Sequence, residues 1–108
     1  MKKIAIVASG AGSNLREIYN QIQIGDIPAK IVLVVSNNPQ CGALIFASEK
    51  GLENFIVNDT RFPNLDTRDK LLLQALLKAE VELICLAGYM KLLPKRIIKE
   101  YKDRILKD

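Results

Sequence analysis

A chain of 108 residues, 49% of them hydrophobic, is long enough for one domain with its own core and too short for two. No stretch approaches the ~20 apolar residues that a membrane span needs, and the apolar run after Lys2 and Lys3 stops at Gly10, too soon for a signal peptide. We therefore expect a single cytoplasmic domain over residues 1–108, without a membrane partner.

The composition does not indicate a metal site or disulfide bonds. The chain has no histidine, and Cys41 and Cys85 are too few and too far apart for a metal site or a disulfide framework. We expect both cysteines to be free thiols and the protein to use no metal.

The net charge of +4 is concentrated near the end of the chain, where residues 91–108 hold seven of the sixteen Lys/Arg and three of the twelve acids. A basic helix there is compatible with nucleic-acid binding. The basic residues recur opposite an apolar face, and few aromatic residues accompany them, so the pattern favours a solvated helix face and no nucleic-acid partner.

The most informative stretch is 3–15, KIAIVASGAGSNL, which predicts a buried strand, a glycine turn and the start of a helix. Ser13 or Asn14 is the expected helix cap. The apolar face of that helix is Leu15, Ile18, Tyr19 and Ile22. The N–H groups of Gly12, Ser13 and Asn14, with the Ser13 hydroxyl, would then suit an anion, most simply a phosphate.

Strands and helices alternate through the rest of the sequence. We expect strands at 29–36, 54–57 and 83–87, helices at 42–50, 66–79 and 94–101, and a fifth strand beginning at 104–106. Gly51 is expected as a left-handed helix end, Asp66 as a helix cap and Pro94 as a first helical residue.

This alternation predicts an α/β fold, a Rossmann-like doubly wound parallel sheet of four to five strands with helices on both faces. The strand at 29–36 is continuously apolar through 31–35, and the strand at 83–87 is apolar throughout, as in strands covered on both faces. In the order 3-2-1-4 the first and fourth strands are neighbours where the winding reverses, and ligands bind there. The loop at 10–14 should therefore face the loop at 88–93.

The glycine turn does not fit the common phosphate motifs. A dinucleotide fingerprint would place a third glycine at Leu15 and an acid after the second strand, which ends instead in Ser36-Asn37-Asn38. A Gly-Lys-Ser/Thr sequence of the Walker type is also absent. Two interpretations stay open at this point: a tight strand-to-helix turn alone, or a G-x-G-S-N site for a compact phosphomonoester.

Three motifs carry a resemblance that extends over the whole chain: SGAGSNL at 9–15, VVSN at 34–37 and LAGYMKLL at 86–93. In this order and spacing the chain resembles the phosphoribosylglycinamide formyltransferase family. The resemblance implies the formyltransferase fold and transfer of a formyl group from 10-formyltetrahydrofolate to glycinamide ribonucleotide, without a metal. For the nucleotide it implies that Gly12, Ser13 and Asn14 hold the phosphate and that Gly88 lies near the ribose.

For the folate, the resemblance implies a site lined by Met90, Lys91, Leu92 and Leu93. Arg68 resembles the family arginine that contacts the formyl-folate, although the helix that follows it is shorter than usual. Arg68 as an exposed first-turn residue and Leu92-Leu93 as core residues are the structural alternatives.

The resemblance ends where the family's catalytic segment begins. The family continues Arg-Ile-Leu into Asn-Ile-His-Pro-Ser, whereas this sequence reads Arg104-Ile105-Leu106-Lys107-Asp108. Formyl transfer needs an oxyanion stabiliser and a proton-transfer group, and a terminal Lys107 is poorly preorganised for the first role.

We therefore expect an N-terminal formyltransferase domain that stops at the start of the fifth strand, has no catalytic residue and is inactive alone. The alternative is a non-catalytic phosphate- or ribonucleotide-binding module. An open fifth-strand edge predicts self-association or pairing with another chain.

Overall fold

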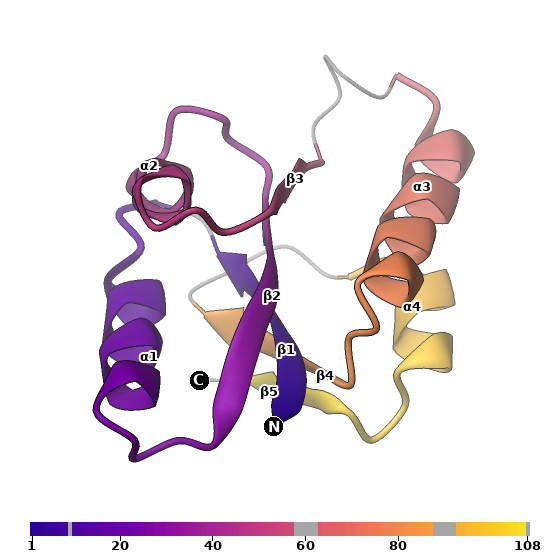
Figure 1. Cartoon of the computed structure of the whole chain (residues 1–108). Coiled ribbons are helices and arrows are strands. Elements are labelled where there is room, and N and C mark those ends of the chain that lie inside the picture. The colour runs from indigo at the N-terminus through magenta and orange to yellow at the C-terminus, as the bar shows by residue number, and fades with distance from the viewer. Residues whose placement is uncertain (9, 58–62, 88–92, 108) are drawn as a thin grey trace.

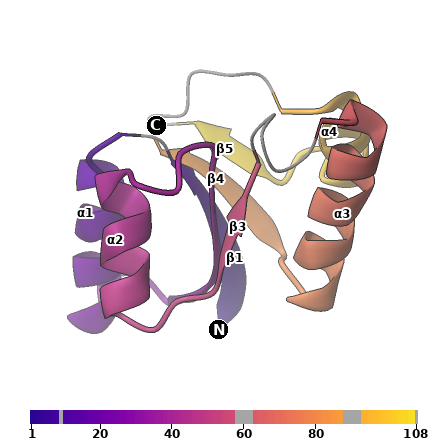
Figure 2. The same ribbon diagram turned by 90° about the horizontal axis from the view of Figure 1, so that it is seen from above.

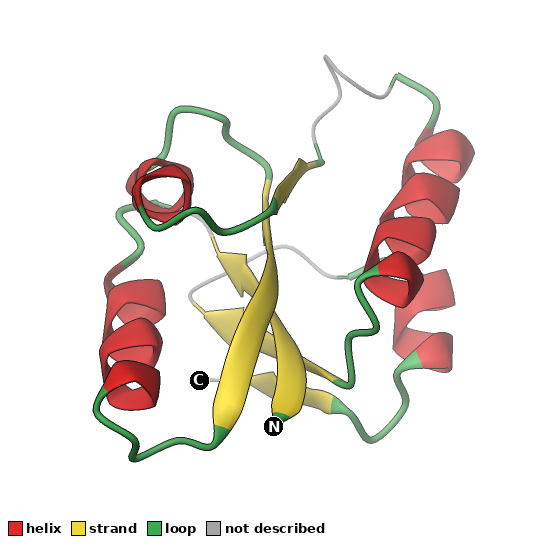
Figure 3. Ribbon diagram, viewed as in Figure 1, coloured by secondary structure: helices red, strands yellow, loops and turns green. Residues whose placement is uncertain are grey.

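The computed structural model describes residues 1–8, 10–57, 63–87 and 93–107, with only the backbone described at position 107. Strands and helices alternate along the chain (Figures 1 and 3). The strands are β1 (Lys2–Ala8), β2 (Ala29–Ser36), β3 (Asn54–Ile56), β4 (Leu83–Ala87) and β5 (Ile105–Lys107). The helices are α1 (Ser13–Gln23), α2 (Gly42–Glu49), α3 (Leu65–Lys78) and α4 (Lys95–Glu100). These elements confirm the expected alternation.

The five strands form one parallel sheet in the order β3-β2-β1-β4-β5. The predicted order 3-2-1-4 is confirmed, and the fifth strand joins the sheet beside β4. The chain winds outward from β1 to one side through β2 and β3, and to the other side through β4 and β5. The winding therefore reverses between β1 and β4.

Helices cover the sheet on both faces, with α1 and α2 on one side and α3 and α4 on the other (Figures 1 and 2). Side chains of β1 alternate between the two cores: Ile4, Ile6 and Ala8 pack with α1 and α2, whereas Ala5 and Val7 pack with α3 and α4. All five are buried, which explains the continuous hydrophobicity of the strand.

Helix starts differ from the predicted caps. Gly12, with φ +80°, is the N-cap of α1, and Ser13 and Asn14 are its first helical residues. Asn64 caps α3 by accepting a hydrogen bond from the Thr67 N–H at 3.1 Å, so Asp66 lies inside the first turn.

Pro94 precedes α4 as its N-cap, because its ψ of 145° is not helical. At the other end of α2, Gly51 has the predicted left-handed conformation, with φ +69°.

Two buried side chains, Ile97 and Tyr101, hold the last helix against the sheet. Tyr101 is 1% exposed, and its hydroxyl donates to the Val81 carbonyl oxygen at 2.9 Å. Ile97 is buried, whereas Lys95, Arg96 and Lys99 are exposed. The basic side chains of α4 are thus exposed as the sequence pattern predicted, whereas Ile98, expected on the apolar face, is 45% exposed.

Candidate functional site

The candidate site lies where β1 and β4 end side by side. Ala8 and Ala87 are the last paired residues of these two parallel strands, so the chain leaves both strands at the same edge of the sheet. From β1 the chain passes through the turn at Gly10–Gly12 into α1. Ligands of doubly wound sheets bind in this position, outside the carboxyl ends of the strands where the winding reverses.

The turn before α1 is held tightly against the start of α2. Ala43 donates its backbone N–H to the Gly10 carbonyl oxygen at 3.2 Å. A Cβ atom on Gly12 would lie 2.6 Å from the Cα of Ala43, and one on Gly42 would lie 2.4 Å from the Ala11 carbonyl oxygen. Only glycine fits at either position, so the two helix starts fix each other's backbone.

Charge at the start of α1 favours an anion. No acidic side chain lies in the first turn of α1, and none lies in the first turn of α2 beside it. Ser13 and Asn14 are exposed, whereas Gly12 is buried. A helix N-terminus carries a partial positive charge and directs backbone N–H groups outward, so this start can accept a phosphate oxygen.

The end of β2 supports the start of α2 through a buried polar contact. Ser36 is fully buried, and its hydroxyl is hydrogen-bonded to the Cys41 thiol at 3.3 Å and accepts from the Asn38 N–H at 3.4 Å. Cys41 is the N-cap residue of α2.

The contacts of Gly42, Ala43, Ser36 and Cys41 were not predicted from the sequence. The signal available was the run of small residues Cys41-Gly42-Ala43 at a predicted helix start.

Arg68 lies in the first turn of α3 and is only partly exposed. Its Nε donates to Asp69 Oδ1 at 3.0 Å, and the second guanidinium contact to the same oxygen is also 3.0 Å. Both side chains are about a quarter exposed, at 24% and 23%. The guanidinium is therefore oriented by its neighbour, unlike that of a freely solvated first-turn arginine.

The other predicted folate residues are only partly described. Leu93 is 8% exposed and packs in the core between the sheet and helices α3 and α4. The predictions for Gly88, Met90, Lys91 and Leu92 concern positions outside the described residues. The structure therefore leaves the predicted site assignments as predictions.

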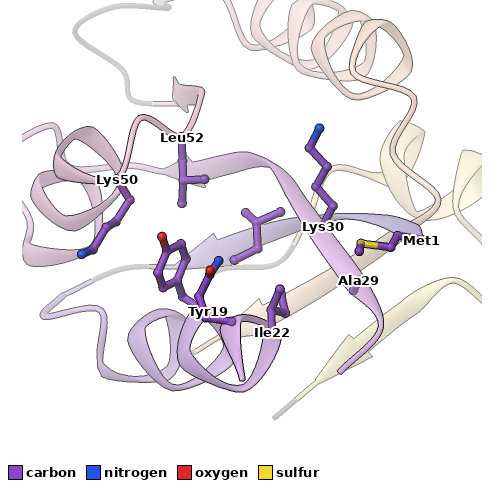
Figure 4. Close-up of a pocket in the computed structure, with 9 residues that line it drawn as sticks. Met1, Tyr19, Ile22, Ala29, Lys30, Lys50 and Leu52 are labelled. Atoms are coloured by element: carbon purple, nitrogen blue, oxygen red, sulfur yellow. The ribbon is translucent and has the colours of Figure 1, made fainter. Parts of the chain in front are cut away.

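A shallow cavity of about 400 Å³ lies elsewhere, between α1 and the beginning of β2 (Figure 4). Tyr19, Ile22 and Leu52 point into it, and Lys50 and Lys30 lie at its rim. Because Lys30 stands near the start of β2, this cavity is at the opposite end of the strands from the turn at Gly10–Gly12. It does not belong to the candidate site.

The structure also describes both cysteines. Cys41 and Cys85 are free thiols, as predicted, and burial raises the pKa of the Cys85 thiol. Within the described ranges, no three His, Cys, Asp or Glu side chains gather into a group that could hold a metal ion. The same ranges contain no helix both long and apolar enough to cross a membrane.

A parallel sheet that winds in both directions from β1, with α1 starting where the winding reverses, defines a doubly wound α/β protein. The family model described as formyl transferase matches residues 2–107. The chain belongs to the formyl transferase family.

Individual relatives support this membership. The phosphoribosylglycinamide formyltransferase of Haemophilus influenzae is 37% identical over 106 residues, which are 98% of this chain and 50% of that protein. Among solved structures, glycinamide ribonucleotide transformylase 1 from Geobacillus kaustophilus superposes with a TM-score of 0.92 at 28% identity, covering 99% of this chain and 57% of the other.

The phosphoribosylglycinamide formyltransferase from Brucella melitensis superposes with a TM-score of 0.88 at 34% identity, covering 98% and 55%. This chain thus spans about half the length of these relatives.

Proposed function

We propose that this chain is the N-terminal, nucleotide-binding part of a phosphoribosylglycinamide formyltransferase, which transfers a formyl group from 10-formyltetrahydrofolate to glycinamide ribonucleotide. The observation that carries the proposal is the start of α1, fixed by α2 at the switch point of a formyl transferase sheet. Several relatives with this fold bear the name of that activity.

The phosphate of glycinamide ribonucleotide is assigned to Gly12, Ser13 and Asn14. Gly12 is held in place by its close approach to Ala43, and Ser13 beside it is an exposed residue that can offer its hydroxyl to the phosphate. Hydrogen bonds to a charged group contribute about 1.5–3 kcal/mol each, so a few of them supply much of the affinity for a ribonucleotide. Gly88, the residue after Ala87 in the sequence, is assigned to the ribose side.

The formyl-folate is assigned to the side of α3 and the segment that follows β4. Arg68 supplies a guanidinium oriented by Asp69, and the buried Leu93 anchors this side of the proposed site to the core. Met90, Lys91 and Leu92 complete the proposed lining. The co-substrate brings the formyl group, and these residues of the chain bind and orient it.

Binding without turnover is the expected behaviour of the 108 residues by themselves. The sequence has no histidine. The described residues at the switch point do not supply both an oxyanion donor and a group that transfers protons. In this proposal residues 1–108 act as one domain, in the cytoplasm, on small molecules. The buried position of Tyr101 supports the solvated-face interpretation of α4, because it leaves that aromatic ring unable to stack on a nucleic-acid base.

The test is a calorimetric titration of the purified chain with glycinamide ribonucleotide, together with a formyl-transfer assay. Ser13→Ala should weaken binding about tenfold, since it removes one hydrogen bond to a charged group. Ser48→Ala, an exposed serine in the last turn of α2, is the matched control and should change nothing.

Equal affinity for inorganic phosphate and glycinamide ribonucleotide would favour the phosphate-binding module instead. Turnover above background would contradict the expected inactivity, and absence of binding would remove the phosphate assignment.

A further inference from the structure

The cavity between α1 and the beginning of β2 has an apolar interior. Ala29 and Ile31 of β2 are buried residues that line it (Figure 4). Ile22 from α1 and Leu52 from the segment after α2 are only partly buried and face it from the helix side. Its volume of about 400 Å³ lies within the range of sites for small ligands. The cavity therefore offers a small molecule apolar surface on more than one side.

Tyr19 forms an aromatic wall of this cavity, and contacts between α1 and α2 fix its ring. The ring meets that of the buried Phe46 edge to face, with the two centroids 5.3 Å apart. The Lys50 ammonium lies 5.7 Å from the centroid of each ring. Edge-to-face and cation–π contacts are both attractive, so they hold the ring of Tyr19 in place before a ligand arrives.

The charged side chains at the cavity are cations. Lys50 and Lys30 stand on opposite sides of it, and among the described residues its lining includes no acid (Figure 4). Within the described part of the chain, neither lysine forms an ion pair. The C-terminal ends of α1 and α2 lie nearby, and each carries about half a negative charge. Two full positive charges exceed that sum, so the cavity attracts an anion.

We propose that this cavity is a second ligand site, which binds a small aromatic carboxylate. The aromatic body lies against Tyr19 and Leu52, and the carboxylate interacts with the ammonium groups of Lys30 and Lys50 at the rim. A neutral aromatic molecule leaves both ammonium groups without a partner, and a bare phosphate leaves the apolar surface uncovered. The site lies at the opposite end of the strands from the turn at Gly10–Gly12, so the proposal does not depend on the proposed substrates.

The test titrates the isotopically labelled chain with naphthoate and, separately, with naphthamide, a neutral molecule of the same shape. Backbone amide shifts measured by heteronuclear NMR give both the affinity and the location. Naphthoate should produce saturable shifts at Tyr19, Ile31 and Leu52, with a dissociation constant of about 1 mM or lower, as expected for a ligand of its size. Naphthamide should bind about fivefold more weakly, because it lacks the charge that the two exposed lysines attract.

A double variant tests the lysines directly. With Lys30→Gln and Lys50→Gln combined, the preference for naphthoate over naphthamide should disappear. The matched control combines Lys78→Gln and Lys99→Gln, which remove the same total charge from exposed positions on α3 and α4, on the opposite face of the sheet. The control should keep the preference of the unmodified chain. Circular dichroism shows whether each variant is folded, and the comparison of the two ligands on the unmodified chain needs no variant.

Absence of saturable binding, equal affinity of the unmodified chain for the two ligands, shifts confined to residues outside the cavity, or the same preference in both double variants would each overturn the proposal. Displacement of naphthoate by glycinamide ribonucleotide or 10-formyltetrahydrofolate would assign the probe to the proposed substrate site, and would overturn it too. Failure of those two substrates to bind, with naphthoate still bound at the cavity, would contradict only the proposed function.

Discussion

Gly12 and Gly10 share a left-handed backbone but differ in their surroundings. Both have φ near +80°, yet a Cβ at Gly10 would meet nothing within 4 Å, whereas one at Gly12 would collide with the backbone of Ala43. Gly10→Ala should cost about 1 kcal/mol for the conformation alone. Gly12→Ala should cost about 3 kcal/mol, since steric overlap adds to the strain.

Urea unfolding of both variants measures this difference in the free energy of unfolding. Equal losses would show that the contact with α2 does not constrain the turn. Binding of glycinamide ribonucleotide should be weakened more by Gly12→Ala than by Gly10→Ala.

The sequence predicted a glycine turn at residues 10–12, but it did not indicate why position 12 requires glycine. The reason is Ala43, which follows Gly12 by 31 residues and approaches it only when α1 and α2 lie side by side on the sheet. The contact of Ser36 with Cys41 is of the same kind. Steric demands between elements leave little trace in local sequence, so reasoning from motifs missed them.

Helix α3 is capped by Asn64, whereas the sequence pattern predicted a cap two residues later, at Asp66. Asn64→Ala removes the side-chain acceptor of the Thr67 N–H and should cost about 1 kcal/mol of stability. Gln74→Ala, at an exposed position in the same helix, should have little effect or stabilise slightly, because alanine favours helix. Chemical denaturation of both variants tests the cap, and similar midpoints would contradict it.

Helix α4 is attached to the sheet through a tyrosine whose titration affects stability. Burial raises the pKa of the Tyr101 phenol, with Arg104 opposing and Glu100 adding to the shift. The folded state therefore holds this proton to higher pH than the unfolded state does. The stability from this group is complete below the unfolded pKa of about 10, and is lost as pH rises above it.

Tyr101→Phe should cost about 1 kcal/mol at neutral pH, because it leaves the Val81 carbonyl oxygen without its donor. It should also make the decline in stability between pH 9 and 11 shallower than in the unmodified chain. Urea midpoints across this range measure both effects. Parallel declines in the two proteins would show that Tyr101 does not contribute.

Element positions were largely predictable, and their ends were not. The apolar periodicity of Leu15, Ile18, Tyr19 and Ile22 predicted the buried face of α1 correctly. The helix caps were predicted wrongly because several residues that can cap a helix stand close together at each helix start. Ser13 and Asn14 follow Gly12, and Asp66 lies two residues after Asn64. Each can cap a helix in isolation, and only the backbone angles decide which one does.

For the molecule as a whole, the sheet order predicts a gradient of local stability. β1 is paired on both sides and buried on both faces, whereas β3 and β5 are three-residue strands at the two edges. Amide hydrogen exchange should therefore be slowest in β1 and fastest in β5. Exchange in β1 as fast as in β5 would contradict this gradient.

The overall topology was predictable because few arrangements satisfy apolar parallel strands with right-handed crossovers. That topology also predicted where the candidate site lies, at the edge of the sheet where β1 and β4 end. Its residue contacts did not follow, because Arg68 and Leu93 belong to segments whose approach depends on packing over the sheet. The pairing of Arg68 with Asp69 is local, yet the sequence alone could not choose it over a solvated side chain.

The interlock between Gly12, Gly42 and Ala43 also limits how this region can be exchanged between relatives. The turn at 10–12 and the segment 41–43 form one steric unit although 28 residues separate them. A chimera that transplants the turn alone would pair it with a foreign partner surface, whereas one that transplants both segments would keep the fit. The two tripeptides should therefore vary together among relatives. A larger side chain in one of them would be compatible with the fold only where the other leaves room for it.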